Sequence, residues 1–191
     1  MGMILKMSAY RLQSVFLPQG WTRDVVISVS DQGLITAIEQ PAPPATGADA
    51  DAIEGIDGVV VPGMPNAHSH AFQRAMAGAT EYRSSASDSF WTWREAMYAL
   101  ARNIQPDELQ TVATQLFIEM LKSGYTSVAE FHYLHRRANG DPYQGRNAMW
   151  QAIEEAAAAA GIGLTLLPTL YQSSDFGARP LRADQIGRAH V

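Results

Sequence analysis

Short apolar runs separated by turn residues occupy the first part of the chain, and this pattern predicts a small unit of β-strands. Strands are expected over residues 10–17, 25–30 and 34–39, with one or two more over 53–61. Gln19-Gly20 and Asp31-Gln32-Gly33 have the composition of the turns between the first three strands. Residues 41–52 are rich in Pro, Ala, Gly and Asp, which indicates a surface loop.

After Pro62 the spacing of apolar residues changes from the alternation of strands to the helical period. Helices are predicted over 89–103, from Pro106 to a stop at Gly124, and over 146–160, with strands over 126–131 and 163–171. The apolar faces expected for the first two helices are Phe90, Trp93, Met97 and Leu100, then Leu109, Val112, Leu116, Ile118 and Leu121.

This alternation of strand and helix favours an α/β fold with a parallel sheet and right-handed crossovers. A complete (β/α)8 barrel needs roughly 250 residues, and about half that length follows the β unit. The pattern therefore fits either a small open α/β domain or a part of a barrel.

The composition is that of a globular protein, since 47% of the 191 residues are hydrophobic and 17% are charged. The net charge of −5, without a basic stripe, argues against nucleic acid as a partner. The apolar runs are too short for a membrane span or a signal peptide, so the expected location is the cytoplasm. The carboxylate pairs at 107–108 and 154–155 are expected on solvated helix faces or as favourable charges in a first helical turn. Because cysteine is absent, any metal must be held by His, Asp or Glu.

The triplet His68-Ser69-His70 is the strongest candidate for chemistry in the chain. It follows the β-branched run at 59–61 and the Pro62-Gly63 break, and a helix-forming region comes after it. Side chains two residues apart on a strand point to the same side, so both imidazoles can reach one ion. This context predicts a place at the carboxyl end of a parallel sheet, where such sites lie. Two imidazole nitrogens at about 2.0–2.1 Å supply half of a tetrahedral zinc site.

Polar side chains near the other predicted element ends are candidates for substrate contacts. Arg94 fits either an exposed position on an amphipathic helix or a bidentate grip on a substrate carboxylate. Gln73 either hydrogen-bonds substrate or faces solvent, and Tyr133 either offers its hydroxyl or simply packs. His132 and His135 could be metal ligands, donors behind the ligands or surface residues. They face opposite sides of an extended segment, so joining one site would require a bend.

A short β unit, then PGMPNAHSH at 62–70, then βα repeats resembles the amidohydrolase superfamily. The stretches HSHAFQRAMAG (68–78), FWTWRE (90–95) and EFHYLH (130–135) are together similar to the members that deaminate N-formimidoyl-L-glutamate in histidine degradation, a likeness over about residues 8–180. The family fold implies that residues 1–61 are part of a small β-sandwich. Residues 62–184 would begin a metal-dependent (β/α)8 TIM barrel, truncated here.

The resemblance implies a hydrolytic deamination in which water attacks the formimidoyl carbon, and N-formyl-L-glutamate and ammonia leave. One zinc ion per site would activate the water, with His68 and His70 as two of its ligands. Gln73, Arg94 and Tyr133 match family positions that hold the substrate. The implied partner is a small acidic molecule, and the complete enzyme is expected to be a homodimer.

In the family, a further His and an Asp that bind the metal, and the acid/base residues, come from later barrel strands. We therefore expect no catalytic general acid or base within this chain, and expect the chain alone to be inactive and poorly soluble. Two alternatives stay open: a deaminase of a purine, pterin or triazine ring, against which Arg94 argues, and a non-catalytic metal-binding α/β module.

The last residues, QIGRAHV at 185–191, back-translate into a string that resembles a sequencing-library adapter. We expect the reading frame to enter non-biological sequence near Gln185. His190 would then have no role in the protein.

Overall fold

The structure is a computed structural model that describes residues 8–42, 53–82, 89–145, 147–170, 173, 177 and 179–181. It divides into two units, Met1–Pro62 and Gly63–Val191, which are described one at a time. The tail at 185–191 and its His190 lie outside the described residues. No helix in the described part of the chain is long and apolar enough to cross a bilayer.

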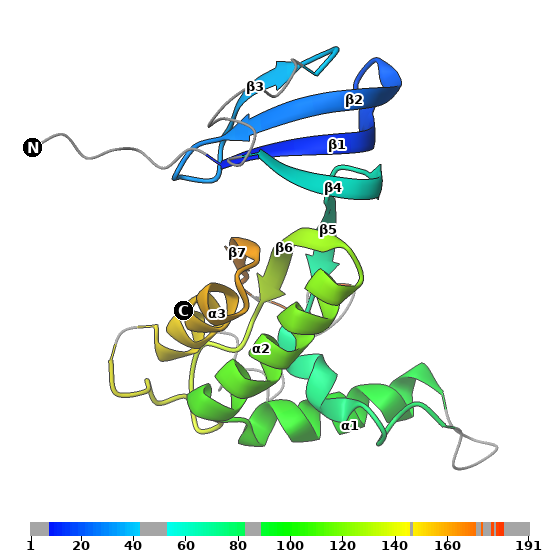
Figure 1. Ribbon diagram of the computed structural model, residues 1–191. Coiled ribbons are helices and arrows are strands. Elements are labelled where there is room, and N and C mark those ends of the chain that lie inside the picture. Colours follow the sequence, from blue (N-terminus) through cyan, green and yellow to red (C-terminus); the bar gives the residue numbers. More distant parts are fainter. Residues whose placement is uncertain are drawn as a thin grey trace, which may run out of the picture. The chain divides into compact units, whose positions relative to one another are not determined.

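The first unit is a four-stranded sheet with the order β3-β2-β1-β4 (Figure 1). Its strands are β1 (Ser8–Leu17), β2 (Gly20–Val29), β3 (Ile35–Glu39) and β4 (Ile53–Val60). β1 pairs antiparallel with β2 and parallel with β4. A small core of Leu12, Val15, Leu17 and Val25 covers one face. A second sheet, which a sandwich requires, is not present among the described residues of this unit.

Two boundaries in this unit differ from the sequence prediction because cross-strand pairing decides them. β2 begins at Gly20, five residues before the predicted apolar run at 25–30, because the ladder with β1 continues through the Phe16–Trp21 pair. Val59 and Val60 end β4 in this sheet, whereas His68 lies on a separate strand that begins after Gly63, and His70 directly follows that strand. The Pro62-Gly63 break therefore separates two units rather than two parts of one strand.

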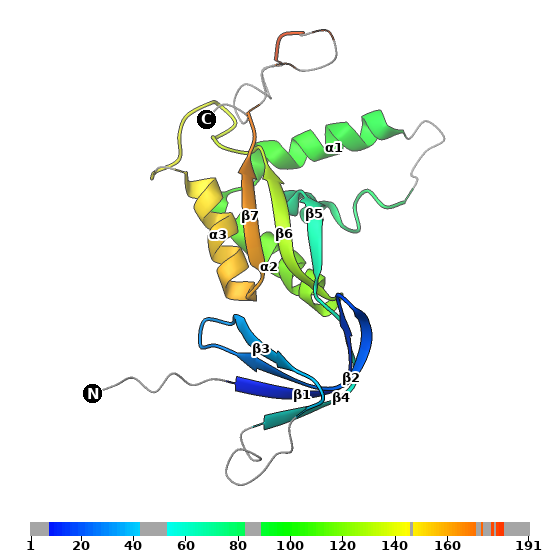
Figure 2. The same cartoon turned by 90° about the horizontal axis from the view of Figure 1, so that it is seen from above.

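The second unit contains three parallel strands in the order β5-β6-β7 (Figure 2). They are β5 (Met64–Ser69), β6 (Tyr125–His132) and β7 (Gly163–Pro168). A short 3-10 helix η2 (Ala71–Met76) and the helices α1 (Phe90–Asn103) and α2 (Pro106–Lys122) join β5 to β6, and α3 (Ala148–Ala160) joins β6 to β7. The predicted α/β architecture with a parallel sheet is confirmed for this unit.

Local sequence signals set the helix ends. The Ser89 side chain accepts a hydrogen bond from the Trp91 amide and closes a capping box at the start of α1. Pro106 occupies the first turn of α2, and Gly161 ends α3 with a φ of 82°. α3 begins at Ala148 rather than at the predicted 146, because the left-handed backbone of Asn147 (φ 65°) cannot continue a helix.

The main core lies between the helices and the sheet of the second unit. α2 and α3 pack against each other, α2 also contacts β6, and α3 contacts β7. The buried positions of α2 are Leu109, Ala113, Phe117 and Met120. Of the predicted face only Leu109 is fully buried, because the packing of α2 against α3, η2 and β6 buries the side that carries Ala113 and Phe117. In α1, Met97 is buried as predicted, but Phe90 is exposed.

Candidate metal and substrate site

His68 and His70 lie at the carboxyl end of β5, where the sequence pattern places them. Their Nε2 atoms are 3.1 Å apart, and the two rings are nearly perpendicular with centroids 4.7 Å apart. The β5–β6 pairing passes from Asn66–Val128 to Ser69–Glu130, so three steps on β5 match two on β6. Such a β-bulge redirects side chains. The Asn66 side-chain oxygen accepts the His68 amide at 3.1 Å within this irregular stretch.

The tautomer of His70 is fixed by the backbone of the neighbouring strand. His70 Nδ1 lies 2.8 Å from the carbonyl oxygen of Phe131, which can only accept, so Nδ1 carries the hydrogen. In the neutral ring, Nε2 then holds a free lone pair. Burial lowers the pKa of His70 more than the hydrogen bond to the carbonyl raises it, and the charge of His68 lowers it further. His70 is thereby kept in the neutral form that binds a metal.

The two nitrogens fit half of a metal site. Two tetrahedral ligands at the usual Zn–N length would be about 3.3 Å apart, close to the 3.1 Å separation observed. In the absence of an ion, the same distance allows a hydrogen bond from His68 to His70. No group of three or more His, Asp or Glu side chains suited to a metal occurs among the described residues. The donor set within those residues is therefore the two imidazoles.

Gln73 and Tyr133 meet beside this histidine pair. Gln73, on η2, places its Nε2 atom 3.3 Å from the hydroxyl of Tyr133, which follows β6. The Tyr133 ring, 8% exposed, packs edge-on to the ring of His70 at a centroid distance of 5.3 Å. The sulfur of Met97, on α1, lies 3.5 Å from both Gln73 Nε2 and the Tyr133 hydroxyl. The structure thus brings these two predicted substrate residues together next to His70.

Arg94 lies on α1, one turn before Met97. Its guanidinium group is 3.3–3.4 Å from the Tyr98 hydroxyl and packs over the rings of Tyr98 and Trp91, 5.4 and 5.6 Å from their centroids. Residues three apart share a helix face, so Arg94 and Met97 lie on the same side of α1. The aromatic frame limits the motion of the guanidinium group and leaves it part-buried, an arrangement that suits recognition of a carboxylate.

His132 and His135 bind backbone carbonyl groups and are not part of the pair formed by His68 and His70. His132 is 1% exposed, and its Nε2 atom lies 2.6 Å from the carbonyl oxygen of Leu134. His135 accepts from the indole nitrogen of Trp150 at 2.9 Å and binds the carbonyl oxygen of Thr169 at 2.8 Å. The two rings nevertheless approach to 5.6 Å, because β6 ends at His132 and the chain bends after it. Burial lowers the pKa of His132 to about 4.

Glu130 is a site residue to which the sequence analysis gave no role. Its side chain is fully buried on β6, and Oε1 accepts the amide hydrogen of Ala71 at 2.6 Å. Burial raises its pKa to about 7, although hydrogen bonds from the Ser69 hydroxyl and the Ala71 amide oppose the shift. The sequence offered one signal for this role, because Glu130 lies at an inward position of a strand in which inward and outward residues alternate. A carboxyl group at such a position is rarely buried without partners.

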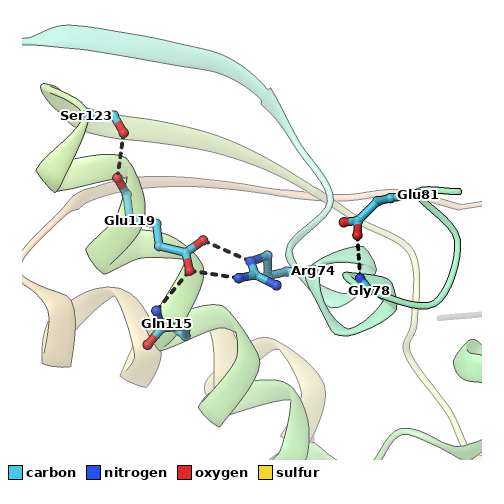
Figure 3. Close-up of polar contacts among 6 residues, drawn as sticks. All are labelled: Arg74, Gly78, Glu81, Gln115, Glu119 and Ser123. Atoms are coloured by element: carbon cyan, nitrogen blue, oxygen red, sulfur yellow. Dashed lines mark hydrogen bonds and ion pairs between the residues drawn. The ribbon is translucent and has the colours of Figure 1, made fainter.

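η2, which carries Gln73, is attached to α2 by an ion pair (Figure 3). Arg74 makes a two-pronged contact with the Glu119 carboxylate at 2.8 and 2.9 Å, and the Gln115 amide donates to one of the same oxygens. These hydrogen bonds hold the pKa of Glu119 down at about 2. Of the predicted solvated carboxylates, Glu108 accepts the Gln105 amide at the start of α2.

The amidohydrolase family model matches residues 59–185, and the chain belongs to that family. It is 48% identical over 179 residues to a formimidoylglutamate deiminase from Pseudomonas aeruginosa, covering 94% of this chain and 38% of that protein. An amidohydrolase structure from Brucella melitensis matches with a TM-score of 0.82 and 41% identity, again over 94% and 38% of the two chains.

A more distant structure shares the fold alone. Atrazine chlorohydrolase from Arthrobacter aurescens, determined with zinc, is 22% identical with a TM-score of 0.67, over 93% of this chain and 40% of that one. The chain therefore spans 38–40% of the length of these relatives.

Proposed function

We propose that the whole protein to which these residues belong is a metal-dependent hydrolase that converts N-formimidoyl-L-glutamate and water into N-formyl-L-glutamate and ammonia. The 48% identity to a protein named formimidoylglutamate deiminase, over 94% of this chain, supports the reaction class. The observation that carries the proposal is the convergence of His68 and His70, with Nε2 atoms 3.1 Å apart and His70 Nδ1 bound to the Phe131 carbonyl.

His68 and His70 would hold a divalent zinc ion through their Nε2 atoms. A bound zinc ion supplies hydroxide near neutral pH, because it lowers the pKa of a coordinated water toward about 7. The Phe131 carbonyl keeps His70 in the tautomer that leaves Nε2 available. Beside the pair, the Gln73 amide and the Tyr133 hydroxyl offer hydrogen bonds to the polar atoms of a substrate.

Arg94 is proposed to bind a carboxylate of the substrate. A planar guanidinium group makes two parallel hydrogen bonds to a carboxylate, and the rings of Trp91 and Tyr98 limit its motion. An uncharged amidine or a purine would leave this group without its anion, which makes binding less favourable. The site is therefore proposed to select a small acidic substrate.

The finer architecture is part of the same proposal. We infer that β5, β6 and β7 are three consecutive strands of a (β/α)8 barrel, supported by their parallel order and by the TM-score of 0.82 to the Brucella melitensis amidohydrolase. The sheet of the first unit would be one layer of a β-sandwich. Its β3 has all five residues exposed, including Ile35 and Ile38, which is consistent with a missing second layer.

The test compares Arg94→Ala with wild type in the whole protein. We expect kcat/KM for N-formimidoyl-L-glutamate to fall about 10- to 150-fold, the equivalent of one charged hydrogen-bonding contact. Arg23→Ala, at an exposed position of β2 in the first unit, removes the same type of side chain and should leave kcat/KM unchanged. Wild-type activity on a purine ring, with no effect of Arg94→Ala, would instead support a ring deaminase.

A further inference from the structure

We propose that Glu130 is a positioning residue, whose buried carboxyl group fixes the His68-Ser69-His70 turn so that both imidazole Nε2 atoms converge on one point. The inference rests on the proposed metal-dependent function and adds a residue to that site. It stands on the hydrogen bonds and burial of the turn and on the pairing of β5 with β6.

The backbone ladder does not hold this turn by itself. Between the Asn66–Val128 pair and the Ser69–Glu130 pair, β5 has one residue more than β6, so His68 lies in a bulge. The last pair of the ladder places Ser69, the final residue of β5, opposite Glu130. The geometry of the two histidines therefore depends on contacts additional to the ladder.

Glu130 supplies contacts on both sides of His70. Its Oε1 atom accepts the Ala71 amide hydrogen at 2.6 Å, and the nearby Ser69 hydroxyl lowers the pKa of the same carboxyl group. The hydrogen bond to Ala71 fixes the peptide that joins His70 to Ala71, and Ser69 is the residue between the two imidazoles. The next residue on β6, Phe131, holds the His70 ring through its carbonyl oxygen. Two neighbouring residues of β6 thus orient both the backbone and the ring of His70.

Burial of this carboxyl group costs free energy, because its second oxygen, Oε2, has no hydrogen-bond partner. Glu130 has no exposed surface, Ser69 is 6% exposed and Ala71 has none. An apolar residue at this inward position of β6 would fill the core without a desolvation cost. It would also leave the buried Ala71 amide without its acceptor, and the turn would be free to rearrange. This combination separates Glu130 from an ordinary core position such as Val128.

The experiment measures zinc affinity of the whole protein by competition with a chromophoric chelator, and the absorption spectrum of its cobalt-substituted form. We expect Glu130→Ala to weaken zinc binding about 10- to 100-fold and to alter the cobalt spectrum. Glu130→Gln keeps an acceptor oxygen and the volume, so it should restore most of the affinity. Ser69→Ala removes one of the two contacts and should weaken binding by a smaller factor.

Two control variants separate positioning from general stability. Val128→Ala creates a cavity on the same strand, so it should lower the melting temperature without changing zinc affinity. Glu154→Gln makes the carboxyl-to-amide change at an exposed position of α3 and should change neither quantity. An affinity of Glu130→Ala equal to that of Val128→Ala would overturn the inference.

If Glu130→Ala does not fold, the zinc affinity of Ser69→Ala tests the inference instead. An affinity equal to that of the wild type would refute the positioning role of Glu130. Failure of the proposed function gives a different result, since the wild-type protein would then bind no zinc at all. Tight zinc binding by wild type together with unaltered binding by the Glu130 variants would leave the function standing and remove only this inference.

Discussion

Replacing Gly63 with alanine should destabilise the second unit, because the added methyl group would collide with Thr126. An ideal Cβ built at Gly63 lies 2.8 Å from the Cβ of Thr126 and nearer still to both of its γ atoms. Rotation about χ1 can move the γ atoms but not the Cβ. Relief of the collision therefore requires β5 or β6 to shift at the start of their pairing, where Met64 lies opposite Tyr125.

The expected loss is about 1–2 kcal/mol of unfolding free energy. Overpacking costs about 1–3 kcal/mol, and Gly→Ala returns up to about 1 kcal/mol by restricting the unfolded chain. Thr126→Ala removes both γ atoms but keeps the 2.8 Å contact, so it should recover part of the loss in the double variant. Because β5 carries His68, the shift should also weaken zinc binding.

Denaturant unfolding of the wild type, both single variants and the double variant gives the coupling between the two positions. Gly55→Ala in β4 is the matched control, since nothing lies within 4 Å of its added Cβ. A Gly63→Ala protein as stable as Gly55→Ala would refute the packing argument. Absence of any recovery in the double variant would show that the γ atoms of Thr126 are not the obstructing groups.

Three further outcomes follow from the same contacts. Ser89→Ala removes the cap of α1 and should cost about 0.5–2 kcal/mol by denaturant unfolding, whereas Ser89→Asn should retain most of the stability. The Arg74–Glu119 coupling in a double-mutant cycle should be fully present above about pH 5 and should disappear as the pH falls toward 2, because the pKa of Glu119 is lowered to about 2 in the folded protein; a pH-independent coupling would contradict the ion pair. Since the pKa of His132 is lowered to about 4, protonation favours unfolding, and stability should fall as the pH drops from about 6.5 toward 4. The difference between wild type and His132→Gln isolates this effect from Glu130, whose raised pKa acts in the opposite direction, and a constant difference across that range would contradict it.

Several features of the candidate site were predictable because they depend on neighbours in sequence. The i, i+2 spacing places His68 and His70 on one side of an extended segment, and the structure brings their Nε2 atoms to 3.1 Å. The end of α3 at Gly161 also depends on a single residue, because glycine readily adopts the positive φ that this position requires. Motif residues in 68–78, 90–95 and 130–135 also carried the family resemblance, and the chain belongs to the amidohydrolase family.

Other features depend on residues far apart in the chain and could not be derived from local patterns. The opposite-sides prediction for His132 and His135 assumed an extended segment, but β6 ends at His132, and the bend brings the two rings to 5.6 Å. The buried stripe of α2 follows Ala113 and Phe117 because α3 packs there, which the apolar period of α2 does not reveal. The roles of Gln73, Arg94 and Tyr133 stay proposals that the activity measurements will test.

By itself the sequence determined the strand and helix segments, the candidate ligands and the family, because spacing and capping are properties of short segments of chain. The tertiary structure alone decided which strand carries the histidines, which nitrogen of His70 is left available, and that Glu130 binds the turn between them. Each of these depends on the register of β5 against β6, strands that are 55 or more residues apart in the chain. Strand register is set by the packing of whole elements, so the contacts that orient the site exist only in the folded unit.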